Sequence, residues 1–127
     1  MAEAYLRKLA GDIFAVESAG LEPGELNPHV VRALREEGID ISGKKTNDVF
    51  EFFKQGRTYN YVITVCSQEA AERCPFFPGR VTRLHWSFPD PSTFTGSDAQ
   101  IMDRVREVRN AIREEIRAFV DRVKSAG

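Results

Sequence analysis

Two cysteines are the side chains of this sequence best suited to chemistry. Cys66 and Cys74 stand eight positions apart and are the chain's two cysteines. They are too few for the disulfide framework of a small secreted domain, so a bond between them would be transient and functional. A disulfide needs Cα atoms about 4.4–6.8 Å apart, whereas eight residues of helix span about 12 Å. If the intervening segment is helical, it must unwind before such a bond can form, so a disulfide between the two cysteines would require a conformational switch. The alternative is two buried, unreactive thiols, since free cysteine is among the most buried residue types.

The composition limits the classes of protein to which this chain could belong. The chain has 127 residues, enough for one domain, which we place at 1–127. Its net charge of −1 gives no bulk attraction to nucleic acid or to an anionic membrane. No apolar run approaches the roughly 20 residues of a membrane span, and the first residues do not form a signal peptide. We therefore expect a soluble cytoplasmic protein with no nucleic-acid or membrane partner.

Helices and strands alternate along the chain and must position the cysteines. We expect helices over 1–9, from Asn27 to Gly38, after a cap at Thr46 or Asn47, and from Ser97 to the end. The last helix has the clearest apolar stripe, which consists of Ile101, Val105, Val108, Ile112, Ile116, Phe119 and Val123. Apolar runs predict strands at 13–17, 61–66 and 81–86, and the second run is typical of a strand covered on both faces. This order favours an α/β sandwich with a mainly parallel sheet.

Short motifs throughout the chain resemble those of a known family. They are Met1-Ala2-Glu3-Ala4, Ser18-Ala19-Gly20, Asn27-Pro28, Gly38-Ile39-Asp40-Ile41-Ser42, Val62-Ile63-Thr64-Val65-Cys66, Cys74-Pro75, His85-Trp86-Ser87-Phe88 and Asp90-Pro91. In this order they resemble the thioredoxin-coupled arsenate reductases, which share the fold of low-molecular-weight protein tyrosine phosphatases. The resemblance implies a three-layer α/β sandwich with a four-stranded parallel sheet and helices on both faces.

The resemblance also assigns roles to individual residues. Cys66 and Cys74 match the second and third cysteines of a cascade in which the first attacks arsenic, the second attacks the first, and the third resolves the resulting disulfide. Asp90 matches a general acid that protonates the leaving oxygen, although an isolated Asp-Pro pair is also an ordinary turn. Thioredoxin is the implied reductant, and no tightly bound cofactor is implied.

A potassium ion is the one metal that the resemblance suggests. The matching positions are Glu3, Ser18, Thr46 and Asp48. Their oxygen ligands suit a hard cation, and the alternative is that they are surface or capping residues. His29 and His85 have no metal-ligand partner at short spacing, so we expect neither to bind a metal.

The family's first strand and its Cys-x5-Arg loop have no counterpart before Met1. Cys74 and Arg80 fit the Cys-x5-Arg spacing, but Pro75, Phe76, Phe77 and Pro78 between them oppose a loop of N–H groups around an anion. We therefore expect this chain to be inactive by itself, with an arsenate or phosphate-like oxyanion bound by a full-length parent. A tyrosine-phosphatase-like hydrolase and a non-catalytic partner-binding relative remain alternatives. Strand edges left unpaired by the absent strand would favour a homodimer.

Overall fold

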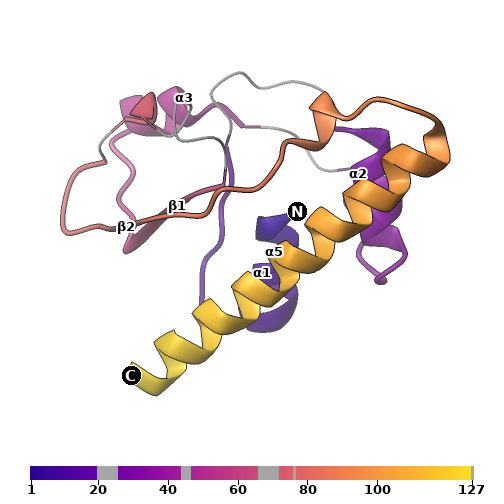
Figure 1. Cartoon of the computed structure of the whole chain (residues 1–127). Helices are drawn as coiled ribbons and strands as arrows, with labels where there is room; N and C mark the ends of the chain where they lie inside the picture. The colour runs from indigo at the N-terminus through magenta and orange to yellow at the C-terminus, as the bar shows by residue number, and fades with distance from the viewer. Residues whose placement is uncertain (20–25, 44–46, 66–71, 76, 127) are drawn as a thin grey trace. The chain divides into compact units, whose positions relative to one another are not determined.

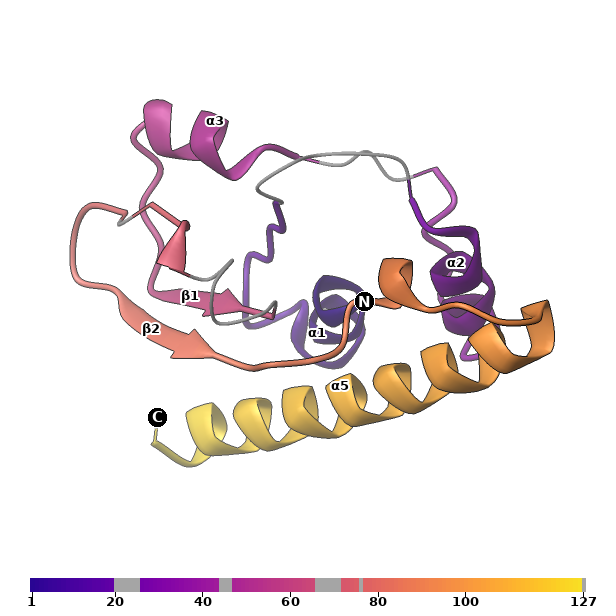
Figure 2. The same ribbon diagram turned by 45° about the horizontal axis from the view of Figure 1, so that its top comes forward.

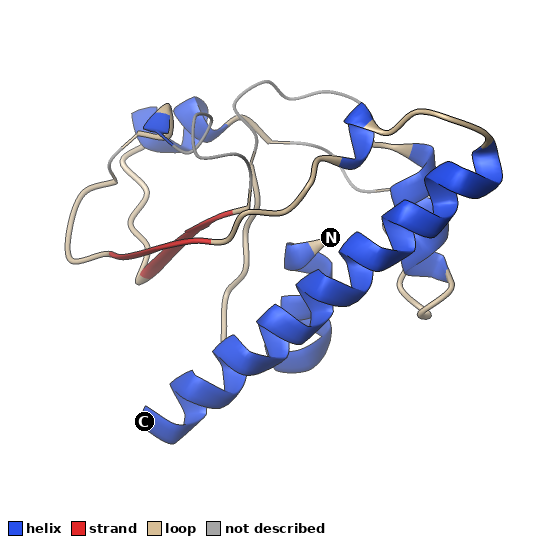
Figure 3. Ribbon diagram, viewed as in Figure 1, coloured by secondary structure: helices blue, strands red, loops and turns tan. Residues whose placement is uncertain are grey.

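The computed structural model describes residues 1–19, 26–43, 47–65, 72–75 and 77–126, and the chain divides into two compact units. The first unit comprises Met1–Glu17, Leu26–Lys44 and Pro91–Gly127. The second comprises Ser18–Glu25 and Lys45–Asp90. The three longest helices belong to the first unit, and the two strands of the described residues belong to the second (Figures 1 and 3).

The first unit is built on its C-terminal helix. It contains α1 (Ala2–Ala10), α2 (Pro28–Arg35), the 3-10 turn η1 (Pro91–Thr93) and α5 (Asp98–Ala126). Both α1 and α2 pack against α5 (Figure 2). The buried face of α5 consists of Met102, Val105, Val108, Ile112, Ile116, Phe119 and Val120. The predicted helix and most of its apolar stripe are confirmed, whereas Ile101 and Val123 are half-buried.

Side-chain caps set the ends of these helices as the sequence predicts. The side chain of Asn27 accepts a hydrogen bond from the backbone N–H of His29 at 2.9 Å, and Pro28 occupies the first turn of α2. Beyond the other end of α2, Gly38 has φ +78°, a conformation that glycine adopts without steric cost. At the start of α5, Ser97 Oγ accepts from Gln100 N–H at 3.2 Å, and Gln100 Oε1 accepts from Ser97 N–H at 3.0 Å. This reciprocal pair is a capping box.

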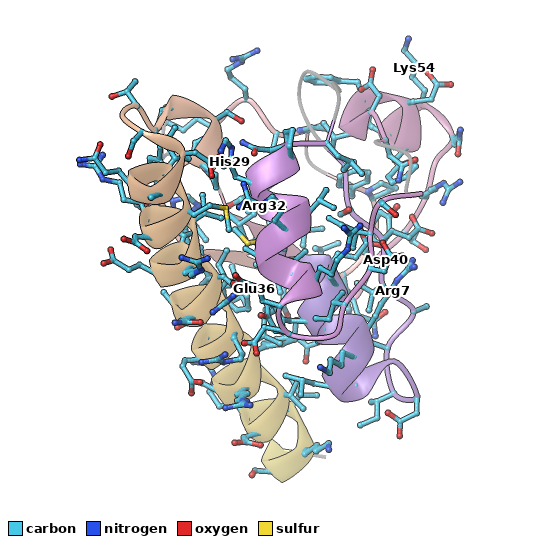
Figure 4. All side chains as sticks on the ribbon, turned by 90° about the vertical axis from the view of Figure 1, so that its right-hand side faces the viewer. Arg7, His29, Arg32, Glu36, Asp40 and Lys54 are labelled. Atoms are coloured by element: carbon cyan, nitrogen blue, oxygen red, sulfur yellow. The ribbon has the colours of Figure 1, made fainter. Side chains whose placement is uncertain are left out.

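An ionic network joins the C-terminal end of α2 to α5. Glu36 accepts hydrogen bonds from Arg106 at 2.8 Å and from Arg109 at 2.8 Å, and Glu37 pairs with Arg113. Arg109 is 9% exposed and also donates to the carbonyl of Ala33 at 2.9 Å, so this charge is buried with partners. Figure 4 shows Glu36 at the end of α2 beside α5. The hydrogen bonds from Arg106, supported by those from Arg109, lower the pKa of Glu36 to about 2.

The second unit holds the sheet and one short helix. β1 (Tyr61–Thr64) and β2 (Thr82–His85) are parallel, with Tyr61 opposite Thr82 and Thr64 opposite His85. The predicted strands at 61–66 and 81–86 are therefore present, and their pairing is parallel as expected. β1 is less covered than its apolar run suggests, since Tyr61 is exposed and Val62 to Thr64 are half-buried. The described part of the sheet contains these two strands alone.

The cap of α3 (Val49–Lys54) differs from the prediction. Asp48, and not Thr46 or Asn47, occupies the N-cap position, and its carboxylate accepts from the backbone N–H of Phe50 at 2.8 Å. An Asp carboxylate both satisfies an unpaired N–H group and complements the positive end of the helix dipole. Thr46 lies outside the described residues.

The predicted strand at 13–17 is wrong. The N–H groups of Ile13 and Phe14 both donate to the carbonyl of Ala10 at 3.0 Å, so the chain turns directly after α1. The guanidinium of Arg7 then donates to the carbonyl of Val16 at 2.6 Å, and the ring of Phe14 stacks on that of Phe119 at 5.7 Å. A backbone acceptor that a strand would use thus binds a side chain instead, and Phe14 of the apolar run packs on α5 while Ile13 stays exposed.

None of the described helices is both long enough and apolar enough to cross a lipid bilayer.

Candidate functional site

The carboxyl ends of β1 and β2 bring two polar side chains together. Thr64 Oγ1 and His85 Nδ1 lie 2.7 Å apart, and the two residues are register partners. The backbone N–H of Trp86, which is 9% exposed, then donates to the carbonyl of Thr64 at 2.7 Å. In open parallel sheets, ligands bind at the carboxyl ends of the strands. His85 is predicted from the sequence to bind no metal, and its pairing with Thr64 is not predicted, although the matched ends of two parallel strands could have indicated it.

Cys74 is the predicted redox residue that the structure describes. It is half-buried, and its Sγ lies 3.7 Å from the carbonyl oxygen of Pro75. Cys66, its predicted partner, lies outside the described residues.

Phe77, three residues after Cys74, contacts two other aromatic rings. Phe77 meets Phe53 of α3 edge-on, with ring centroids 6.0 Å apart, and meets Tyr59 edge-on at 5.1 Å. We call Phe53, Tyr59 and Phe77 the aromatic clasp. Phe77 is half-buried, whereas Phe53 is 43% exposed.

The ring contacts of Phe77 also affect whether the segment from Cys74 to Arg80, which has the Cys-x5-Arg spacing, could form an anion-binding loop. Phe77, in the middle of that segment, has its ring fixed between two others, and Arg80 is exposed. An anion loop requires successive N–H groups that converge on one point. A segment pinned by a bulky side chain and interrupted by two prolines is poorly suited to that geometry.

Asp90, the predicted general acid, is exposed directly before η1. Pro91 begins this turn, and its carbonyl accepts from the N–H of Phe94 at 3.2 Å. A carboxylate at such a position can contact a ligand from solvent without a desolvation cost.

The four predicted potassium ligands have different surroundings. The side-chain amide of Asn47 donates to the carbonyl of Ser18 at 2.9 Å, which ties Ser18 to the segment that contains Asp48. Asp48 caps α3, and Thr46 is not described. Glu3 belongs to the other unit and pairs with Arg7 at 3.1 Å, one turn along α1. Within the described part of the chain, no group of three or more His, Cys, Asp or Glu side chains could hold a metal ion.

Comparisons with known proteins agree with this arrangement. The sequence profile of the family described as low molecular weight phosphotyrosine protein phosphatase matches residues 1–127. An arsenate reductase of Bacillus licheniformis is 40% identical over 123 residues, which cover 95% of this chain and 85% of the relative.

Solved structures show the same fold. An arsenate reductase in oxidized state matches with a TM-score of 0.78 and 24% identity, over 96% of this chain and 86% of that one. An arsenate reductase in the phosphate binding state matches with a TM-score of 0.71 and 25% identity, over 95% of this chain and 86% of that one. These matches confirm the predicted α/β class with a parallel sheet.

Proposed function

The chain belongs to the low molecular weight phosphotyrosine protein phosphatase family, and from that premise we propose that it takes part in the reduction of arsenate to arsenite. The observation that carries the proposal is the similarity to an arsenate reductase over nearly the whole chain. A half-buried cysteine, Cys74, with a second cysteine eight positions before it, supports the same assignment.

In the proposed cascade, Cys66 and Cys74 supply the electrons. A first thiolate, which residues 1–127 do not supply, would bond to arsenic as an arsenic–oxygen bond breaks and water leaves, and the Cys66 thiolate would then attack that sulfur. Arsenite leaves with the electron pair of the sulfur–arsenic bond, and a disulfide to Cys66 forms. The Cys74 thiolate next attacks the sulfur of Cys66 and releases the first thiolate. Two thiols have then become one disulfide, and arsenic has gained two electrons.

Thioredoxin would return the Cys66–Cys74 disulfide to two thiols, because its dithiol can exchange with an accessible disulfide. Asp90 would donate a proton to the oxygen that leaves arsenic in the first step. The substrate would be arsenate or a phosphate-like oxyanion, a class of ligand in line with the relative solved in a phosphate binding state.

A potassium ion would serve the fold rather than the chemistry. Ser18, whose carbonyl is bonded to Asn47, and Asp48, the N-cap of α3, would supply oxygen ligands. These oxygens fit a hard cation. Glu3 is held by Arg7, which leaves it a weaker candidate.

The first experiment tests the cysteine couple directly. The reduced chain is incubated with oxidised glutathione, and its free thiols and mass are measured before and after thioredoxin is added. We expect an intramolecular disulfide that thioredoxin reduces, and none in Cys66→Ser or Cys74→Ser. Free thiols throughout, or disulfide-linked dimers alone, would contradict the proposal.

A second experiment tests the inactivity of residues 1–127 by themselves. Neither Cys66 nor Cys74 begins a loop suited to an anion, so the first step has no nucleophile with an anion clamp. We expect no arsenate turnover with thioredoxin and its reductase, and no hydrolysis of an aryl phosphate. Arsenate turnover that Cys66→Ser abolishes would show that the chain is active alone, and hydrolysis without reduction would favour a phosphatase.

A further inference from the structure

Thr64, the last residue of β1, bonds to two consecutive residues at the end of β2. Its Oγ1 lies 2.7 Å from Nδ1 of His85, and its carbonyl accepts a hydrogen bond from the N–H of Trp86 at 2.7 Å. The first bond uses the side chain of Thr64 and the second uses its backbone. Thr64 thus adds a side-chain bond to the backbone pairing that joins the carboxyl ends of the two strands.

The Thr64 hydroxyl can keep its bond with either form of the imidazole ring. A threonine hydroxyl has one proton to donate and two lone pairs that accept. It can donate to Nδ1 of His85 when that nitrogen carries no proton. When Nδ1 carries a proton, the hydroxyl oxygen can accept from it and turn its own proton toward the carbonyl of Leu84, 3.4 Å away. The bond between β1 and the ring therefore does not depend on which ring nitrogen is protonated.

The segment that follows this pair, residues 86–90, carries the proposed general acid, and we call it the Asp90 segment. It forms neither helix nor strand between β2 and η1 (Figure 3). Because it has no hydrogen-bonded ladder of its own, its position depends on where it leaves the sheet. Asp90 stands four residues beyond Trp86, and a chain extends by at most about 3.6 Å per residue, so a fixed Trp86 keeps Asp90 within about 14 Å.

We infer that the hydrogen bond between Thr64 and His85 positions the Asp90 segment by holding the end of β2 against the end of β1. The consequence for the Asp90 carboxyl group rests on the proposed function, which gives that group its role as an acid. Thr64 and His85 are positioning residues, since they act through the backbone of the segment. The alternative is that the buried side chain of Trp86 and its backbone bond to Thr64 are sufficient to hold the segment.

Nuclear magnetic resonance of the full chain tests the inference at the amides of the segment. Thr64→Val keeps the size and branching of the side chain and removes its hydroxyl. In this variant we expect the Trp86 amide to exchange with solvent on the order of five- to tenfold faster, which is the effect of one lost hydrogen bond. The amide resonances of Ser87, Phe88 and Asp90 should move as well. Thr64→Ser keeps the hydroxyl and should restore both the exchange rate and the resonances.

Thr82→Val is the matched control. Thr82 is an exposed threonine at the start of β2, and its N–H donates to the carbonyl of Asn60 at 2.9 Å. The same change of side chain at this position leaves both bonds of Thr64 in place. The exchange rate of the Trp86 amide should therefore stay within about twofold of wild type, because separated sites act independently.

A double variant separates this bond from a general loss of packing. His85→Phe removes Nδ1 but keeps a planar ring, and it should accelerate exchange of the Trp86 amide by the same factor as Thr64→Val. If the two side chains act through their mutual bond, the double variant should exchange no faster than either single variant. The Nδ1 resonance of His85 should move in Thr64→Val and stay in place in Thr82→Val. Thermal unfolding shows whether each variant is folded, and His85→Phe replaces Thr64→Val if the latter unfolds.

The outcomes separate this inference from the proposed function, since neither amide exchange nor these resonances depend on a cysteine. If Thr64→Val matches Thr82→Val, or if the effects of Thr64→Val and His85→Phe add in full, the inference is overturned whatever the redox experiment shows. If the expected pattern is found but the cysteine couple fails its own test, the pair still positions the segment, and the role of Asp90 in arsenate chemistry fails alone.

Discussion

At the scale of one residue, Glu36 shows how ion pairs formed on folding change a pKa. Its carboxylate accepts hydrogen bonds from two arginines of α5, and these lower its pKa from 4.5 to about 2. A carboxyl group whose pKa is lowered by folding stabilises the protein above its unfolded pKa. That contribution is lost as pH falls through the folded value.

The pH dependence of stability should therefore reveal Glu36. As pH falls from about 5 to about 2, the midpoint of thermal unfolding should decrease, and Glu36→Gln should make this decrease shallower because its side chain does not titrate. Glu107→Gln is the control, since Glu107 is an exposed carboxylate on α5. If Glu36→Gln and wild type lose stability in parallel over this range, the ionic network contributes nothing to acid sensitivity.

At the scale of the secondary-structure element, side-chain caps stabilise the ends of the helices. The box between Ser97 and Gln100 satisfies two N–H groups at the start of α5, and both arms are present in the structure. We expect Ser97→Ala to lower the free energy of unfolding by about 1 kcal/mol. Chemical denaturation measures the change.

Thr95→Ala is the control for this cap, because Thr95 is an exposed residue two positions earlier. An equal loss in both variants would show that the cap itself adds little. A larger loss in Ser97→Ala would confirm that the hydroxyl acts through Gln100.

The same caps explain how much of the fold the sequence could predict. Asn27-Pro28, Gly38 and Ser97 bound their helices through contacts within a few residues, so a local pattern suffices. The cap of α3 was misplaced by one or two positions, because Thr46, Asn47 and Asp48 can all accept from an N–H group and the competition is decided by geometry.

Strands depend on distant partners, and there the prediction is weaker. Residues 61–64 and 82–85 form strands because each supplies the other's hydrogen bonds. The run at 13–17 has similar composition, yet Arg7 takes the carbonyl of Val16 and Phe14 packs on Phe119. Likewise, local motifs are enough to predict roles for Cys74 and Asp90, whereas the pairing of Thr64 with His85 depends on strand register.

At the scale of the whole molecule, the two units differ in how much they bury. The side chains that are less than 2% exposed and largest in volume are Leu34, Met102, Val105 and Ile116, all in the first unit. Among the described residues of the second unit, the buried apolar side chains are those of Val49 and Trp86. Regions with few buried apolar contacts open locally at lower free energy.

Hydrogen exchange should therefore be uneven along the chain. Amide protons in the middle of α5, around Val105 to Ile116, should exchange much more slowly than those of β1 and β2. Mass spectrometry of exchanged peptides under native conditions measures both. Equal protection in the strands and in α5 would contradict this distribution of stability.

Because of Trp86, the second unit can be followed separately by tryptophan fluorescence. It is the chain's one tryptophan, it is 9% exposed, and its backbone is bonded to Thr64 at the end of β1. The first unit contains Tyr5 but no tryptophan, so indole emission belongs to the second unit alone. The wavelength and intensity of that emission therefore report on the surroundings of Trp86 at the end of the strands. No dye has to be attached, and the helices of the first unit contribute no indole signal.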